Sequence, residues 1–304
     1  MSHRISRLNK AIDWISSGYV CSPKPLAALR IGFGLFTLIW PRDITWIREM
    51  SVVAYSPPVG PFSLLSGPPP SQVIFGLGLL QATVAILVAI GWKTKTVSTL
   101  LSLTFIVASG FAYSYGKVDH LILFDIAPLM LGLAGWGSAW SVDARFANKK
   151  LRTDGFPMFL YGTMIAFAFF TAAAIKAATG WLEPGIEATR YYIVSDLLYS
   201  DPGPMASWIL GINSPLLWKF LDYSTLFVEG CLILAVFFPG LFRIGLVLAS
   251  VFHVGVFLTL GISFEMHAFV YLGFFLLPFA KWFPEIELLR DMKSRRRRAP
   301  TIAS

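Results

Sequence analysis

The stretch FAFFTAAAIKAATGW, from Phe167 to Trp181, decides how the chain folds. It belongs to an apolar run over residues 157–180, and about 20 such residues cross a bilayer as one helix. One lysine, Lys176, lies close to its far end. An ammonium group in hydrocarbon is costly, so it faces a protein cavity or reaches the interface. Position alone leaves Lys176 as either a working base or an anchor at an interface marked by Trp181.

The whole chain has the composition of a membrane protein. Its 304 residues are 56% hydrophobic and only 14% charged, with a mean hydropathy of +0.66. Soluble domains carry about 25% charged residues. Long apolar runs alternate with short charged loops, and we find no alternating segments of about ten residues that would indicate a β-barrel. The sequence therefore predicts an all-α fold, a polytopic transmembrane helical bundle.

Hydropathy predicts about eight spans. They cover residues 25–40, 72–92, 97–115, 120–140, 157–180, 216–238, 242–260 and 265–283. A loop rich in proline and glycine, residues 56–70, is expected on the outer face. Short amphipathic pieces are expected at residues 186–199 and 205–212.

Lysine and arginine distinguish the two sides of the membrane. With the N-terminus inside, the inner segments hold Arg4, Arg7, Lys10, Lys24, Lys93, Lys95, Arg145, Lys149, Lys150, Arg152, Arg243, Lys281, Arg290, Lys293 and Arg295–Arg298. The outer side holds Arg42, Arg48, Lys117, Arg190 and Lys219. This asymmetry predicts a multi-pass protein with an even number of spans and both termini cytoplasmic.

Three regions follow from this topology. Residues 1–24 form an amphipathic interfacial segment, residues 25–285 the transmembrane domain, and residues 286–304 a basic cytoplasmic tail. The net charge of +8 reflects this topology and gives no reason to expect a nucleic-acid partner. The expected partners are membrane lipids, which the run Arg295–Arg298 could contact through anionic headgroups.

Ionisable residues recur within the expected spans, mostly in their outer halves. They are Arg30, Asp119, His120, Asp125, Lys176, Asp222, Glu229, His253, Glu265 and His267. Because such residues in membranes face one another or a polar cavity, we predict an outward-facing cavity.

Several of these residues have two readings. His120 is either a proton relay or a capping histidine beside Asp119. For His253 the commoner role is structural, a hydrogen bond to a neighbouring helix of the bundle. Asp222 and Glu229 need partners, and Arg30 is a candidate for a structural or a functional pair with Glu229.

Common enzyme signatures are absent from the sequence. There is no HExxH or CxxC, no pair of histidines four residues apart, and no Walker A or Rossmann glycine pattern. The two cysteines, Cys21 and Cys231, are poor candidates for a disulfide. We therefore expect no metal and no nucleotide chemistry. The 26 Phe, 10 Trp and 10 Tyr suit lipid contact and would also suit a flat quinone or an isoprenoid tail.

Residues 25–285 resemble the vitamin K-dependent γ-glutamyl carboxylase family and its bacterial relatives, the HTTM (horizontally transferred transmembrane) domain proteins. The resemblance rests on Leu29–Gly34, on Asp119-His120 with Trp140–Asp143, on Ala174-Ile175-Lys176 with Trp181-Leu182-Glu183, and on Phe252-His253 followed by Gly261–Phe264. The carboxylases carry a large lumenal region after the spans, and we find no counterpart to it in this sequence. The resemblance thus implies a bacterial relative without that region, located in the bacterial inner (plasma) membrane.

The resemblance implies that Lys176 is the base that deprotonates vitamin K hydroquinone. It also implies that His120 has a role in the carboxylation step. It implies a quinol-oxidising lyase that uses vitamin K hydroquinone or another quinol as cofactor. Asp119, Asp125, Trp181, His253, Glu229 and Arg30 would then line the cofactor site.

Two functions of different classes follow. The first is a membrane enzyme with Lys176 as base, oxidising a quinol with oxygen and coupling this to glutamate carboxylation of a secreted peptide. The second is a non-enzymatic membrane protein that binds lipid or assists maturation or export of a secreted peptide. A secondary transporter ranks last, because no internal repeat is visible.

Overall fold

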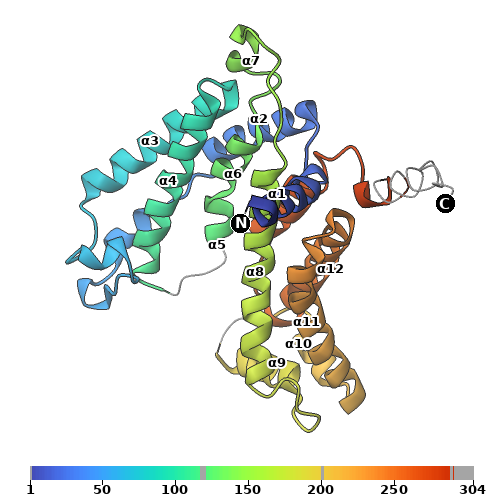
Figure 1. Ribbon diagram of the computed structural model, residues 1–304. Helices are drawn as coiled ribbons and strands as arrows, with labels where there is room; N and C mark the ends of the chain where they lie inside the picture. Colours follow the sequence, from blue (N-terminus) through green and yellow to red (C-terminus); the bar gives the residue numbers. More distant parts are fainter. Residues whose placement is uncertain (1, 117–120, 200–201, 288–289, 291–304) are drawn as a thin grey trace, which may run out of the picture. The chain divides into compact units, whose positions relative to one another are not determined.

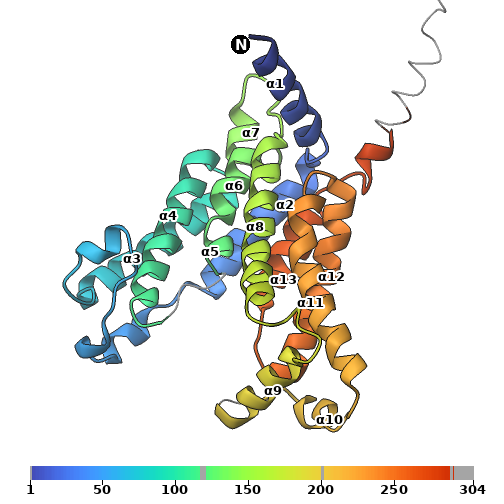
Figure 2. The same ribbon diagram turned by 60° about the horizontal axis from the view of Figure 1, so that its bottom comes forward.

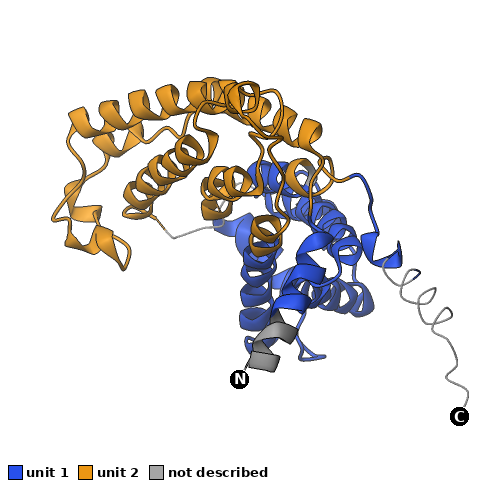
Figure 3. Cartoon of the chain, turned by 45° about the horizontal axis from the view of Figure 1, so that its top comes forward, with its two compact units in different colours: residues 1–19, 162–272, 280–304 blue, residues 20–161, 273–279 orange. Residues whose placement is uncertain are grey.

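The structure is a computed structural model that describes residues 2–116, 121–199, 202–287 and 290. Every regular element in these ranges is helical. The described chain forms two compact units (Figure 3): unit 1 contains residues 1–19, 162–272 and 280–304, and unit 2 contains residues 20–161 and 273–279. The two units divide helix α8 between them.

Unit 2 is built on three long helices, α2 (Pro23–Ile39), α3 (Ser71–Ile90) and α4 (Thr94–Tyr113). Helix α3 packs against α2 and against α4, and α4 packs in turn against α5 (Leu121–Asp125) and α6 (Ala127–Ala134), as Figure 1 shows. The expected loop over residues 56–70 contains one 3₁₀ turn, Pro61–Leu64, and two more, Thr45–Glu49 and Val52–Ala54, precede it. The one-turn helix α7 (Val142–Phe146) follows α6.

The core of unit 2 is aromatic. The buried Phe33 ring lies 5.1 Å from Phe124, 5.8 Å from Trp136 and 5.9 Å from Phe274, measured between ring centroids. Trp136 also donates its indole N–H to Ser98 Oγ at 2.9 Å. A buried indole needs such a partner, so this bond explains why a tryptophan is tolerated there.

Unit 1 contains α1 (Ser2–Ser17), most of α8 (Phe156–Ala178), α9 (Ala188–Tyr199), α10 (Ala206–Leu210), α11 (Pro215–Ala235), α12 (Pro239–Leu260) and α13 (Glu265–Ala268). Helices α11 and α12 pack side by side, and the short helices α9 and α10 pack at one end of them (Figure 2). Buried Trp218 in α11 packs there with Ile193 and Ala206 and donates its indole N–H to the carbonyl of Ile212 at 3.1 Å.

The prediction of a helical membrane protein is confirmed at this level. Four of the described helices, α3, α4, α8 and α12, are long and apolar enough to cross a membrane. The other expected spans coincide with helices that are shorter, broken or more polar: α2, α5 with α6, α11 and α13.

Two of the expected spans are wrong in extent. The fourth, residues 120–140, is interrupted at Ile126 and ends at Ala134. Pro128 lacks the N–H that would continue the helix through this point, and Gly135 ends it with a φ of 91°. The eighth, residues 265–283, changes from α13 to a wider π-helical turn over Phe269–Phe274 and does not continue to residue 283.

Candidate functional site

Lys176 of α8 forms an ion pair with Glu229 of α11, both within unit 1. The Nζ of Lys176 donates a hydrogen bond to Oε1 of Glu229. The lysine side chain is 24% exposed and the glutamate side chain 6%. The other carboxylate oxygen, Oε2 of Glu229, is buried and has no hydrogen-bond partner among the described residues. Buried carboxylate oxygens are nearly always hydrogen-bonded, so this oxygen is an acceptor whose bonding capacity is unused within the described structure.

Trp181 covers the same lysine. Helix α8 ends at Ala178, and Gly180 adopts a φ of 92°, which turns the chain back. The Nζ of Lys176 then lies 5.4 Å from the centroid of the buried Trp181 ring, within the range of a cation–π contact. Trp181 therefore belongs with Lys176 and Glu229 in one site.

A second lysine holds the loop that carries Trp181. The Nζ of Lys219 donates to the carbonyls of Trp181 at 3.1 Å, Glu183 at 2.9 Å and Ile186 at 2.7 Å, and to Oδ2 of Asp222 at 2.9 Å. These contacts fix the backbone of the loop from α8 to α9, so Lys219 positions the Trp181 ring over Lys176.

Asp222 anchors the far end of that loop. Its fully buried carboxylate accepts the backbone N–H of Ala188 at 3.2 Å and of Thr189 at 2.8 Å, and the hydroxyl of Thr189 at 2.7 Å. Asp222, a residue of α11, thereby caps the N-terminus of α9. Its negative charge is stabilised there by the helix dipole.

His253 lies in an aromatic cluster of unit 1. Its ring stacks on Phe264 at 4.0 Å and 7°, and it lies 5.6 Å from the ring of Phe169. His267 and Tyr271 complete the cluster, each at 5.9 Å from His253. Stacked imidazole and phenyl rings of this kind offer flat apolar surfaces.

The cluster and the ion pair lie along one stripe of α8. Phe169, Ala173 and Lys176 follow a spacing of four and three residues, so their side chains share one face. Ala173 opposes Gly230, the residue after Glu229: a Cβ added at Gly230 would lie 3.8 Å from Cβ of Ala173. Seven residues rise about 10 Å along a helix, which gives the distance along α8 between Phe169 and Lys176.

Arg30 has a different environment from the one expected. It lies fully buried in unit 2 and donates to the backbone carbonyls of Trp136, Ala139, Trp140 and Ala89. Glu229 has Lys176 as its partner instead. The pairing of Arg30 with Glu229 is therefore wrong: backbone carbonyls after the end of α6 and in the last turn of α3 accept hydrogen bonds from the two terminal nitrogens of the guanidinium.

Asp125 is likewise in unit 2. Its buried carboxylate accepts the hydroxyl of Ser109, and Ser109 Oγ accepts from Nε and Nη2 of Arg42 at 3.2 and 3.1 Å. The Nε of Arg42 is 4.0 Å from Oδ1 of Asp125. The serine thus links the carboxylate to the guanidinium that compensates its charge.

The other two predicted site residues, Asp119 and His120, lie outside the described residues. Of the predicted set, the structure brings together Lys176, Glu229 and Trp181. His253, on α12, packs against Phe169, farther along the same face of α8. In the part of the chain that the structure describes, no group of three or more His, Cys, Asp or Glu side chains could hold a metal ion.

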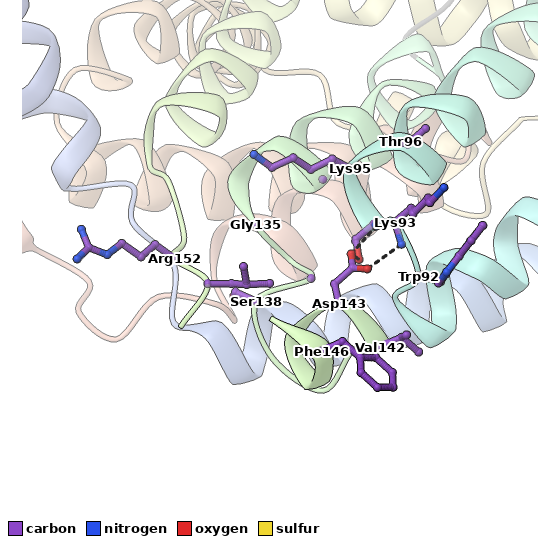
Figure 4. Close-up of a pocket in the computed structure, with 14 residues that line it drawn as sticks. Trp92, Lys93, Lys95, Thr96, Gly135, Ser138, Val142, Asp143, Phe146 and Arg152 are labelled. Atoms are coloured by element: carbon purple, nitrogen blue, oxygen red, sulfur yellow. Dashed lines mark hydrogen bonds between the residues drawn. The ribbon is translucent and has the colours of Figure 1, made fainter. Parts of the chain in front are cut away.

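A cavity of about 680 Å³ lies elsewhere, in unit 2 (Figure 4). Its lining comes from the turn between α3 and α4, the end of α6, the loop through α7 and the segment before α8. The residues are Trp92, Lys93, Thr94, Lys95, Thr96, Gly132, Gly135, Gly137, Ser138, Val142, Asp143, Phe146, Leu151 and Arg152. Lys176, Glu229 and Trp181 are not among them.

Sequence reasoning missed Lys219, which belongs to the site formed by Lys176, Glu229 and Trp181. The sequence identifies Lys219 only as a positive charge on the outer side. The signal that could have found it is the spacing of Lys219 and Asp222, three residues apart on one helix, where opposite charges meet. The carbonyls that Lys219 binds come from a loop, and no pattern in the sequence specifies them.

The chain was compared with known proteins by sequence and by structure, and no family model, curated protein or solved structure matches it.

Proposed function

We propose that this protein is an integral-membrane enzyme that binds a hydroquinone or a related isoprenoid lipid and removes a proton from it with Lys176. The observation that carries the proposal is the ion pair of Lys176 with Glu229, in which Oε2 of Glu229 is buried without a partner. A hydroquinone hydroxyl could donate a hydrogen bond to this oxygen. The flat ring of the ligand could lie against the flat ring of Trp181.

Lys176 and Glu229 would act as one proton-accepting unit. Transfer of the shared proton from Nζ of Lys176 to the Glu229 carboxylate would leave a neutral amine beside the ligand. The amine lone pair then takes the hydroxyl proton of the ligand. The resulting ammonium remains beside the ligand oxygen and stabilises its negative charge.

The resemblance to γ-glutamyl carboxylases supplies the rest of the proposed reaction. A vitamin K hydroquinone or another quinol, once deprotonated, would be oxidised by O2 to an epoxide and water. In the coupled step, a glutamate of a secreted peptide would lose a γ-proton and its carbanion would add CO2. We further propose eight spans with both termini cytoplasmic, which places Lys176 on the outer side of a bacterial inner membrane.

The test measures oxygen uptake by the purified protein in proteoliposomes that contain a reduced menaquinone or vitamin K hydroquinone. Lys176→Met should abolish quinol-dependent oxygen uptake, and Glu229→Gln should reduce it strongly. Lys281→Met is the matched control, because Lys281 also pairs with a glutamate, Glu287, but at an exposed site. Its oxygen uptake should equal that of the wild type.

Unchanged oxygen uptake in Lys176→Met would overturn the proposed role of the lysine. Quinol that binds the wild type without any oxygen uptake would instead favour the non-enzymatic function, a membrane protein that binds lipid or assists a secreted peptide.

A further inference from the structure

The cavity of unit 2 is lined by more positive than negative charge. Lys93, Lys95 and Arg152 contribute three cations, and Asp143 contributes the one carboxylate among the lining residues (Figure 4). No ion pair joins any of these three cations to a carboxylate within the described ranges. The lining therefore has a net charge that favours an anion.

The carboxylate of Asp143 is already occupied. Its Oδ1 accepts the backbone N–H of Lys93 at 2.8 Å, and its Oδ2 accepts the N–H and the hydroxyl of Thr94 at 2.7 and 2.6 Å. Asp143 thus caps the start of α4, and the backbone amides there are not open to a ligand. Recognition of an anion falls to the side chains of the cations.

Two further features describe the ligand. The buried hydroxyl of Ser138 lines the cavity and has no hydrogen-bond partner in the described structure, so it can donate to an anionic oxygen. Trp92, Phe146 and Leu151 line the same cavity and are exposed, Phe146 to 76%. A ligand that contacts both the Ser138 hydroxyl and these apolar side chains must carry an anionic oxygen group and an apolar part.

The side of the membrane adds a third argument. In the topology proposed above, on which this step rests, Lys93, Lys95 and Arg152 lie on the cytoplasmic side, where the leaflet carries anionic lipids. The volume of about 680 Å³ lies within the range of about 300–1,000 Å³ that is usual for small-molecule sites. We infer that this cavity binds the phosphate-bearing headgroup of an anionic phospholipid of the inner leaflet, with Lys93, Lys95 and Arg152 supplying the positive charge of its lining.

The inference is independent of the reaction at Lys176, and its test needs no activity. The full-length protein in detergent is titrated with phosphatidylglycerol or phosphatidylcholine, and bound lipid is counted by native mass spectrometry. The cavity variant is Lys93→Gln/Lys95→Gln/Arg152→Gln. The matched control, Arg145→Gln/Lys149→Gln/Lys150→Gln, removes the same charge from residues that do not line the cavity.

We expect the wild type to prefer phosphatidylglycerol over phosphatidylcholine. Its affinity for phosphatidylglycerol should fall at least about tenfold in the cavity variant and less than about threefold in the control. An equal loss in both variants, or equal binding of the two lipids by the wild type, would overturn the site. Glycerol phosphate that displaces the lipid at a similar concentration would show that a soluble phosphate compound is the ligand, which also overturns the phospholipid assignment.

A second measurement does not depend on the folding of a variant. A phosphatidylglycerol that carries a photoreactive acyl chain is bound to the wild type and irradiated. Labelling should concentrate on peptides that contain Trp92, Phe146 and Leu151. Labelling spread evenly over the apolar helices contradicts the inference.

Discussion

The Nζ of Lys176 donates to Oε1 of Glu229, a residue 53 positions later in the chain, and this contact joins α8 to α11 inside unit 1. Removing one partner of such a pair leaves a buried charge uncompensated. Lys176→Met should therefore lower the free energy of unfolding by about 2–3 kcal/mol, less than for a fully buried pair because the lysine is partly exposed.

The double variant Lys176→Met/Glu229→Leu is the control for this prediction. Because it removes both charges, its stability should return to within about 1 kcal/mol of the wild type. SDS-titration unfolding in micelles measures Lys176→Met, Glu229→Leu and the double variant. A double variant that is as unstable as the sum of the single changes would contradict the pairing.

Gly180 sets the path of the chain after α8. Its φ of 92° is costly for a residue with a Cβ, and an added Cβ would lie 3.1 Å from Cδ1 of Ile186. Gly180→Ala should cost about 1–2 kcal/mol and raise the hydrogen exchange of the Trp181 and Glu183 amides. Gly185→Ala is the matched control, since nothing lies within 4 Å of its added Cβ. Equal exchange in both variants would contradict the role of the turn.

Asp222 is expected to be the main anchor of α9. Asp222→Asn removes the charge that pairs with Lys219 and weakens the cap at Ala188 and Thr189. The unfolding free energy should fall by about 2–3 kcal/mol, with the largest rise in hydrogen exchange over residues 186–199. Glu187→Gln breaks the partly exposed pair with Arg190 and should cost less than about 1 kcal/mol. A similar cost for both changes would argue against the anchor.

Tyr19 is expected to make the stability of the protein depend on pH. Its hydroxyl donates to the carbonyl of Val236 at 2.6 Å, and burial raises the pKa of the phenol well above its ordinary value, with nearby Arg243 opposing and Glu285 adding to the shift. A raised pKa of the folded state stabilises the protein below the unfolded-state pKa of about 10, and this contribution is lost as the pH rises above it.

The wild type should therefore lose stability faster than Tyr19→Phe above a pH of about 10. Below that pH, Tyr19→Phe should be less stable by about 1 kcal/mol, because it lacks the hydrogen bond to Val236. Melting temperatures at neutral and alkaline pH measure both effects. Parallel curves for the two proteins would contradict a buried, uncharged phenol.

Part of this structure could be predicted from local sequence. Apolar runs determine α3, α4, α8 and α12, because a helix satisfies its own backbone hydrogen bonds and needs only enough consecutive apolar residues to cross a bilayer. The same argument singled out Lys176 and Trp181 as residues at a helix end. It misjudged the helix at residues 120–140, where Pro128 and Gly135 override hydropathy.

Partners of the polar residues could not be predicted in the same way. The sequence by itself determined that Arg30 and Glu229 needed compensation, because each lies in an apolar helix. Only the tertiary structure decided that Lys176 compensates Glu229 and that backbone carbonyls compensate Arg30. It alone also gathered Lys93, Lys95 and Arg152 around one cavity. Hydropathy acts locally along the chain, whereas charge compensation depends on which distant segments the packing brings within a few ångströms.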